Sequence, residues 1–128
     1  MIDLSGSIFV YAMPVDMRKS IDGLGMLVNS EFTSEPMAYR AKGVPEVTNT
    51  KAPIFVFINR SHDKLKILMK EGNGFCLIYK RLDRGRFQIN LAIQGPLHLT
   101  QQQLRWLLDG LDYASLKPLQ SPHYSVVF

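Results

Sequence analysis

The stretch IFVFINRSHDKLKILMKEGNGFCLIYKRLDRGRF at residues 54–87 decides the fold. It opens on an unbroken run of β-branched and aromatic residues at 54–58, which is typical of a strand buried on both faces. Apolar and basic residues then largely alternate at 64–70, as they do in a half-buried strand. The sequence EGNG at 71–74 tolerates positive φ and predicts a hairpin turn that leads into a return strand at 75–82. We therefore predict an antiparallel β-meander.

The positive charge of the chain is concentrated in this meander. Residues 59–86 hold eight of the fifteen Lys and Arg residues and three of the eleven Asp and Glu residues, a formal charge of +5, whereas the rest of the chain carries −1. Positive charge gathered on one sheet is typical of a surface that binds a polyanion. For Lys64, Lys66 and Lys70 a second interpretation stays open, because lysines alternating along a strand also form an ordinary solvated face. Nine basic residues are the candidates for nucleic-acid binding: Arg18, Lys19, Arg60, Lys64, Lys66, Lys80, Arg81, Arg84 and Arg86.

A helix is predicted before the meander. Apolar residues recur at spacings of three and four from Met17 onward, and Asp16 precedes them in the position of an N-cap, so we expect a helix near 17–30. Arg18 and Lys19 would occupy its first turn, where the helix dipole disfavours cations. This local misfit indicates either a binding role for the two cations or simple exposure.

A second helix is predicted after the meander. Thr100 and Gln103 match a capping box, and the leucines that follow predict a helix at 101–110. The apolar face of each helix needs a sheet to cover. The expected fold class is therefore α+β, an antiparallel β-meander with two helices packed against one face. Five residues are expected to be buried in it: Leu24, Leu65, Ile67, Leu104 and Leu108.

The length of 128 residues favours a single domain with one core. We expect the α+β domain to span residues 1–113, with a long loop or insertion at 33–53, and a C-terminal tail to follow at 114–128. The insertion has no steady hydrophobic period and contains three prolines. Since long structureless loops are uncommon in compact domains, a short strand near 37–39 is an alternative for part of it.

The remaining composition indicates a cytoplasmic protein. No apolar run reaches the eighteen or so residues of a membrane span. The N-terminal residues lack a basic segment, so we do not expect a secretory signal. A single cysteine, Cys76, excludes an internal disulfide and fits a reducing compartment. Because Cys76 lies within a predicted strand, we expect it to be buried and inert.

The sequence contains no motif that is typical of a catalytic or cofactor-binding site. The three histidines and Cys76 have no metal-ligand spacing, and the only Gly-rich turn lacks the helix of a phosphate-binding loop. Asp16, Asp22 and either Asp109 or Asp112 could meet around Mg²⁺ as in a nuclease, but roles at helix ends explain them equally well. We therefore expect no enzyme activity, no cofactor, no metal and no small-molecule ligand.

Several short blocks in a fixed order resemble a known family. The likeness covers roughly residues 8–112 and rests on VDMRKSIDGL at 15–24, FVF at 55–57, NR at 59–60, DKLK at 63–66, GNGFCL at 72–77, YKRL at 79–82, GRF at 85–87 and LLDGLD at 107–112. These blocks are similar to those of TnpB, the small accessory protein of the IS sixty-six family of insertion sequences, and not to the RNA-guided nuclease of the same name. The resemblance implies a role in transposition beside a separate transposase that carries the catalysis.

Two hypotheses follow from the charge pattern and the resemblance. In the first, the protein is a transposition accessory protein that binds DNA non-specifically through the basic meander. In the second, it is a protein adaptor that binds the transposase or another subunit without touching DNA. The expected partners are thus DNA and transposition proteins, and a membrane is not among them.

Overall fold

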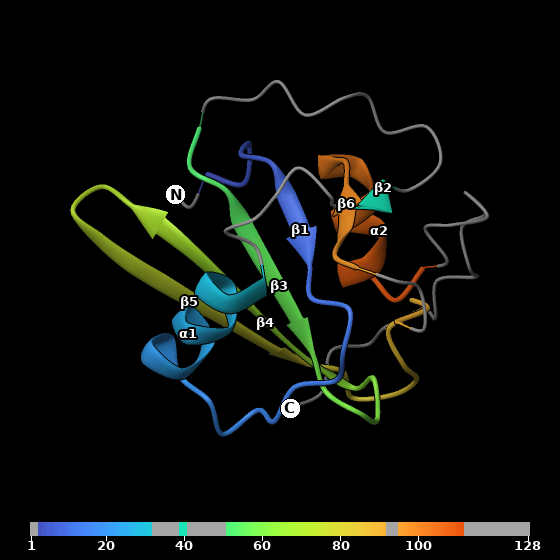
Figure 1. The fold of residues 1–128 in the computed structure, drawn as a ribbon. Helices are drawn as coiled ribbons and strands as arrows, with labels where there is room; N and C mark the ends of the chain where they lie inside the picture. Colours follow the sequence, from blue (N-terminus) through green and yellow to red (C-terminus); the bar gives the residue numbers. More distant parts are fainter. Residues whose placement is uncertain (1–2, 32–38, 41–50, 92–94, 112–128) are drawn as a thin grey trace.

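The computed structural model describes most of the chain and confirms the α+β class. Described are residues 3–31, 39–40, 51–91 and 95–111. The elements, in chain order, are β1 (Ile8–Val10), α1 (Ile21–Glu31), β2 (Tyr39–Arg40), β3 (Ile54–Ile58), β4 (Lys64–Glu71), β5 (Gly74–Arg81), β6 (Leu97–Leu99) and α2 (Gln101–Leu108) (Figure 1). Strand β2 falls within the expected insertion at 33–53, close to the strand considered at 37–39. The rest of that insertion up to residue 50 and the expected tail at 114–128 lie outside the described residues.

The sheet is mixed, although its largest part is the predicted meander. The strand order is β2-β6-β1-β3-β4-β5. Strands β3, β4 and β5 pair antiparallel, as expected. Strand β1 pairs parallel with β3, and β2 pairs parallel with β6. A parallel pair needs a long crossover connection, and the chain between β1 and β3 supplies one that contains α1. The pattern within each strand could not reveal these long-range partners.

The hairpin between β4 and β5 has the predicted turn. Glu71 pairs with Gly74, so the loop consists of Gly72 and Asn73 alone. Gly72 has φ +56°, while Asn73 keeps a negative φ. This combination is the one expected of a type II′ turn, whose twist matches that of the flanking strands. The turn therefore fixes the register in which the basic residues of β4 face those of β5.

The two helices pack on opposite faces of the sheet, so the expectation that both cover one face is wrong. Leu104 of α2 belongs to the apolar cluster that contains Ile8 and Val10, and this side is called the α2 face. Leu24 of α1 belongs to a second cluster with Phe9, on what is called the α1 face. Alternation along β1 places these two sets on opposite sides. Both faces of the central strands are apolar, and each therefore needs its own cover.

Most residues expected in the core are buried, with two exceptions. Leu24, Leu65, Ile67 and Leu104 are at most 1% exposed. Leu108 is half-buried at the edge of its cluster, and Leu107 takes its place at the centre. Cys76 was expected to be buried but is half-buried beside the α2-face cluster.

The start of α1 differs from the prediction. The helix begins at Ile21 and not near residue 17. Asp16 does not cap it but closes a turn, in which its Oδ1 accepts from the Arg18 N–H at 2.9 Å and its carbonyl accepts from the Lys19 N–H at 3.1 Å. An Asp side chain that accepts a hydrogen bond from a nearby backbone N–H competes with helix formation at that position. Arg18 and Lys19 therefore precede the helix and do not occupy its first turn.

Candidate nucleic-acid interface

One end of the sheet, where β3 ends, β4 begins and β5 ends, is built around Asn59. The Asn59 Oδ1 accepts from the backbone N–H groups of Asp63 at 3.1 Å and Lys64 at 3.0 Å. Its Nδ2 donates to the Asp63 carboxylate at 2.7 Å. His62 completes the loop in the left-handed region with φ +58°, which is uncommon for a residue other than glycine. These bonds hold the β3–β4 loop in one conformation, and Arg60 within this loop is exposed.

The arginine-rich turn after β5 is tied to the same loop. The Leu82 N–H donates to the Asp63 carbonyl at 2.8 Å, and the Phe87 N–H donates to the His62 carbonyl at 2.6 Å. Phe87 is buried in the α2-face cluster and anchors the far end of the turn. Arg84 and Arg86, between these anchor points, are exposed. The fold thus brings the basic turn next to the loop that carries Arg60.

Cations of β4 and β5 meet at this end. Lys64 and Arg81 are directly opposite each other in the antiparallel register. Like charges directly opposite each other disfavour a sheet, and the Lys64 amine also lies 3.4 Å from the Asp63 carboxylate. We call this region the basic end. With Arg18, which lines the adjoining cleft, it carries six cations, the others being Arg60, Lys64, Arg81, Arg84 and Arg86, against the three acids Asp16, Asp63 and Asp83.

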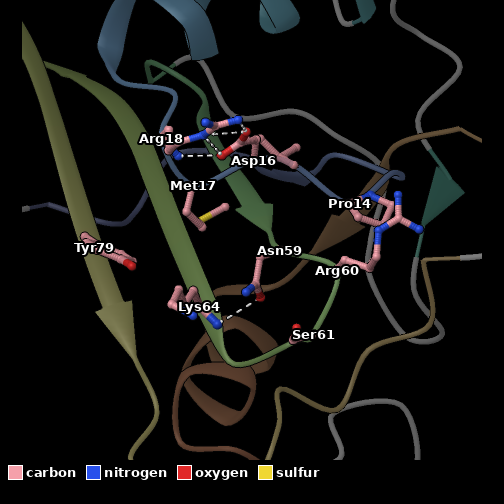
Figure 2. A pocket seen from close by; sticks show the side chains of 10 residues that line it. Pro14, Asp16, Met17, Arg18, Asn59, Arg60, Ser61, Lys64 and Tyr79 are labelled. Carbon is pink, nitrogen blue, oxygen red and sulfur yellow. Dashed lines mark hydrogen bonds and ion pairs between the residues drawn. The ribbon is translucent and has the colours of Figure 1, made fainter.

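A cleft of about 560 Å³ opens beside the basic end. Residues 14–18 and 59–61 line it together with Lys64 and Tyr79 (Figure 2). In Figure 2, Tyr79 lies on β5 on one side and Arg60 on the opposite side, with Arg18 above them. The cleft therefore joins three segments that are distant in sequence and combines three cations with one aromatic ring.

Arg18 is held by Asp16 at the rim of the cleft. The Arg18 Nε donates to both carboxylate oxygens at 2.9 and 3.1 Å, and its Nη2 donates to Oδ2 at 2.6 Å. These hydrogen bonds, with that from the Arg18 backbone, lower the pKa of Asp16 to about 2. The Arg18 side chain is nevertheless 92% exposed. The pair thus orients the guanidinium while leaving most of it open to a ligand.

Lys66, one of the candidate binding residues, uses its amine inside the protein. Only 8% of the residue is exposed, and its Nζ donates to the carbonyls of Met17 at 2.6 Å and Lys19 at 2.8 Å. The same amine lies 5.1 Å from the centre of the Tyr79 ring, a distance typical of a cation–π contact. Lys66 therefore fixes two walls of the cleft, the turn at 16–19 and the Tyr79 ring.

Lys80 is also committed, on the other face of the sheet. The end of α2 has the bonds of a Schellman motif, with the Gly110 N–H donating to Leu107 and the Leu111 N–H donating to Trp106. The Lys80 Nζ donates at 2.5 Å to the carbonyl of Leu108, which this motif leaves unpaired. A cation at this position also complements the helix dipole. The structure thus separates Lys80 from the other candidates, and Lys19 is exposed but does not line the cleft.

Sequence reasoning missed Asn59 and the cleft itself. Asn59 and Asp63 flank a short polar run between two strands, and this composition indicates a turn with side-chain bonds. The cleft left no comparable signal, because its walls come together only in the fold. Within the described part of the chain, no three His, Cys, Asp or Glu residues are grouped to hold a metal ion; Asp112 lies outside that part. Of the helices among the described residues, none has the length and apolar character to span a membrane.

Comparison with known proteins identifies the family. The family model described as "IS66 Orf2 like protein" matches residues 6–118. Uncharacterized protein y4jC of Sinorhizobium fredii is 30% identical over 117 residues, covering 90% of this chain and 89% of that protein. Uncharacterized protein y4hO of the same organism is 39% identical over 77 residues, covering 60% of this chain and 67% of that protein. No solved structure matches. The resemblance seen in the sequence is thus confirmed, and the chain belongs to the IS66 Orf2-like family of accessory proteins associated with the transposition of insertion sequences.

Proposed function

We propose that the protein is a non-catalytic accessory factor of transposition, acting in the cytoplasm, that binds DNA without sequence preference through the basic end. The observation that carries this proposal is the gathering of six cations, drawn from the turn before α1, from residues 60–64 and from residues 81–86, at one end of the sheet. Lys64 and Arg81 face each other there at a cost to the sheet, which supports a role in binding an anion.

The available contacts set the expected affinity. Lys66 and Lys80 donate to backbone carbonyls and are left out of the proposed surface. If four of the six cations reach phosphates together, the log–log salt slope on duplex DNA is about −3.6. Contacts of this kind carry no sequence information, so the dissociation constant at physiological salt is of order micromolar or weaker. Target choice then rests with the transposase.

A salt titration of DNA binding tests the proposal. Replacing Arg81, Arg84 and Arg86 by Ala should flatten the slope by up to about 2.7 units, since three phosphate contacts are removed. The matched control replaces Lys51, Lys70 and Arg105 by Ala, which removes the same charge from exposed positions elsewhere. Equal losses in the two triple variants would mean that only net charge matters. An unchanged slope in a folded Arg81/Arg84/Arg86 variant would exclude the basic end.

The adaptor hypothesis is the second candidate, and the position of β5 at the edge of the described sheet favours it. Within the described sheet β5 is the last strand, eight residues long, so its outer side can accept a strand from a partner. Phe75 on this strand is 62% exposed. Co-precipitation with the transposase of the same element, after nuclease treatment, tests this candidate. The adaptor hypothesis would be favoured by two results together. The wild-type protein would form a complex with the transposase that Phe75→Glu disrupts, and it would fail to bind DNA at low salt.

A further inference from the structure

We propose that the cleft holds one unpaired nucleotide of single-stranded DNA, with the base stacked on Tyr79 and its phosphate contacted by Arg18, Arg60 and Lys64. This inference rests on the proposed function, since it assumes that the basic end binds DNA. It adds the form of the ligand, because a duplex and a single strand place different chemistry against such a cleft.

Tyr79 has the properties of a stacking platform. It lies on the α1 face opposite Lys66, beyond the part of β5 that α1 covers at Leu77. The residue is 52% exposed, although Lys66, its cross-strand partner on this face, is only 8% exposed. The Lys66 amine, held by two carbonyls, lies 5.1 Å from the ring centre. That contact fixes the ring before a ligand arrives, which lowers the entropic cost of stacking.

The surrounding groups suit the rest of a nucleotide. The cleft has a volume of about 560 Å³, within the roughly 300–1,000 Å³ of small-molecule pockets, and it is open to solvent. Arg18, Arg60 and Lys64 line the cleft and supply donors to a phosphate. The hydrogen bonds from the Arg18 side chain to Asp16 use Nε and Nη2 and leave Nη1 outside this pairing. Asn59 and Ser61 add polar atoms to the lining.

A duplex cannot use this combination fully. Its bases are stacked on one another and present only their edges in the grooves. The face of a base is open to an aromatic side chain only when the nucleotide is unpaired or flipped out. Phosphates, in contrast, are accessible in both forms. The cations of the basic end therefore serve either ligand, whereas Tyr79 distinguishes a single strand from a duplex.

The test compares fluorescence anisotropy on labelled oligo(dT) and on a duplex of the same length. Tyr79→Ala should weaken oligo(dT) binding by roughly 5- to 150-fold, the range for loss of one stacked base. Tyr79→Phe should bind like the wild type, because it keeps the ring. Tyr79→Leu keeps the bulk without the π-face and should lose affinity as Ala does. Phe75→Ala is the matched control, since Phe75 is an exposed aromatic on the same strand but outside the cleft.

The outcomes separate this inference from the function on which it rests. Duplex binding should change by no more than about two-fold in every Tyr79 variant. Equal losses on oligo(dT) and duplex, or a loss as large in Phe75→Ala, would overturn the inference. If the protein binds DNA with the expected salt slope but Tyr79→Leu leaves oligo(dT) affinity unchanged, the inference is overturned and the proposed function still stands. A wild-type protein that binds neither DNA would overturn both.

Discussion

The two faces of the sheet are used in different ways. On the α2 face, a continuous apolar cluster runs from β6 and β1 through β3 to β4, and α2 closes it with Leu104 and Leu107. On the α1 face the buried cluster is smaller, and α1 covers it around Leu24. Beyond α1, the same strands carry Lys64, Arg81 and the exposed Tyr79.

This difference shows how one sheet can carry both stability and a candidate site. The α2 face is nearly closed to water, and side chains there contribute mainly by burial. The α1 face is closed only in its middle, so that side chains near the strand ends face the cleft. One lysine serves each face. Lys66 donates to the turn that lines the cleft on the α1 face, and Lys80 donates to the end of α2 on the α2 face.

The largest expected effect is on stability, and it comes from comparing two neighbouring residues of β4 that lie on opposite faces of the sheet. Leu65 is fully buried on the α2 face, and Leu65→Ala should lower the free energy of unfolding by about 2–5 kcal/mol. Lys64→Ala, on the α1 face, should change it by no more than about 0.5 kcal/mol while weakening DNA binding. Urea unfolding followed by circular dichroism measures the first quantity, and anisotropy the second. Similar stability losses in both variants would contradict the division between the faces.

The second effect concerns two lysines on the α1 side of β4. Lys66→Met leaves the Met17 and Lys19 carbonyls without their donor and should cost about 1–3 kcal/mol of unfolding free energy. Lys70→Met is the matched control, because Lys70 is exposed near the hairpin. Lys66→Met should also weaken DNA binding indirectly, by releasing the turn that positions Arg18. Equal free energies of unfolding in the two variants would show that the hydrogen bonds of the Lys66 amine do not contribute to stability.

A smaller effect is expected for Lys80. Lys80→Met removes the cation from the last carbonyl of α2 and should lower the free energy of unfolding by about 1 kcal/mol. Its DNA affinity should stay unchanged, because the amine lies on the α2 face, away from the cleft. The same urea and anisotropy measurements apply. A clear loss of DNA affinity with intact stability would return Lys80 to the binding surface.

The smallest effect is a titration. The pKa of Asp16 is lowered from 3.8 to about 2 by the hydrogen bonds from Arg18, and Arg18→Ala should return it toward 3.8. Because the folded-state pKa lies below the unfolded value, the pair stabilises the fold above pH 3.8 and loses this contribution as the pH falls through about 2. The exposure of the pair keeps the contribution small. Carboxyl-carbon NMR chemical shifts against pH measure it; a midpoint near 3.8 in the wild type would refute the pairing.

The local features of this protein follow from its sequence alone. Alternation at 64–70 predicted β4, the EGNG turn predicted its hairpin with β5, and Thr100 with Gln103 predicted the capping box of α2, which is present. Each depends on neighbours within a few residues, so the necessary information lies in a short window. The family blocks were recognisable for the same reason.

Long-range packing, in contrast, sets which groups share a face and which cations stay exposed. The parallel pairing of β1 with β3 joins the N-terminal strand to the meander, and neither strand records its partner in its own pattern. Lys64 and Lys66 are alike in sequence, yet the Lys66 amine is buried against carbonyls 47 and 49 positions away, whereas Lys64 lines the cleft. The physical reason is that alternation fixes the side of the strand on which a charge lies, while its environment depends on what the rest of the chain packs above it.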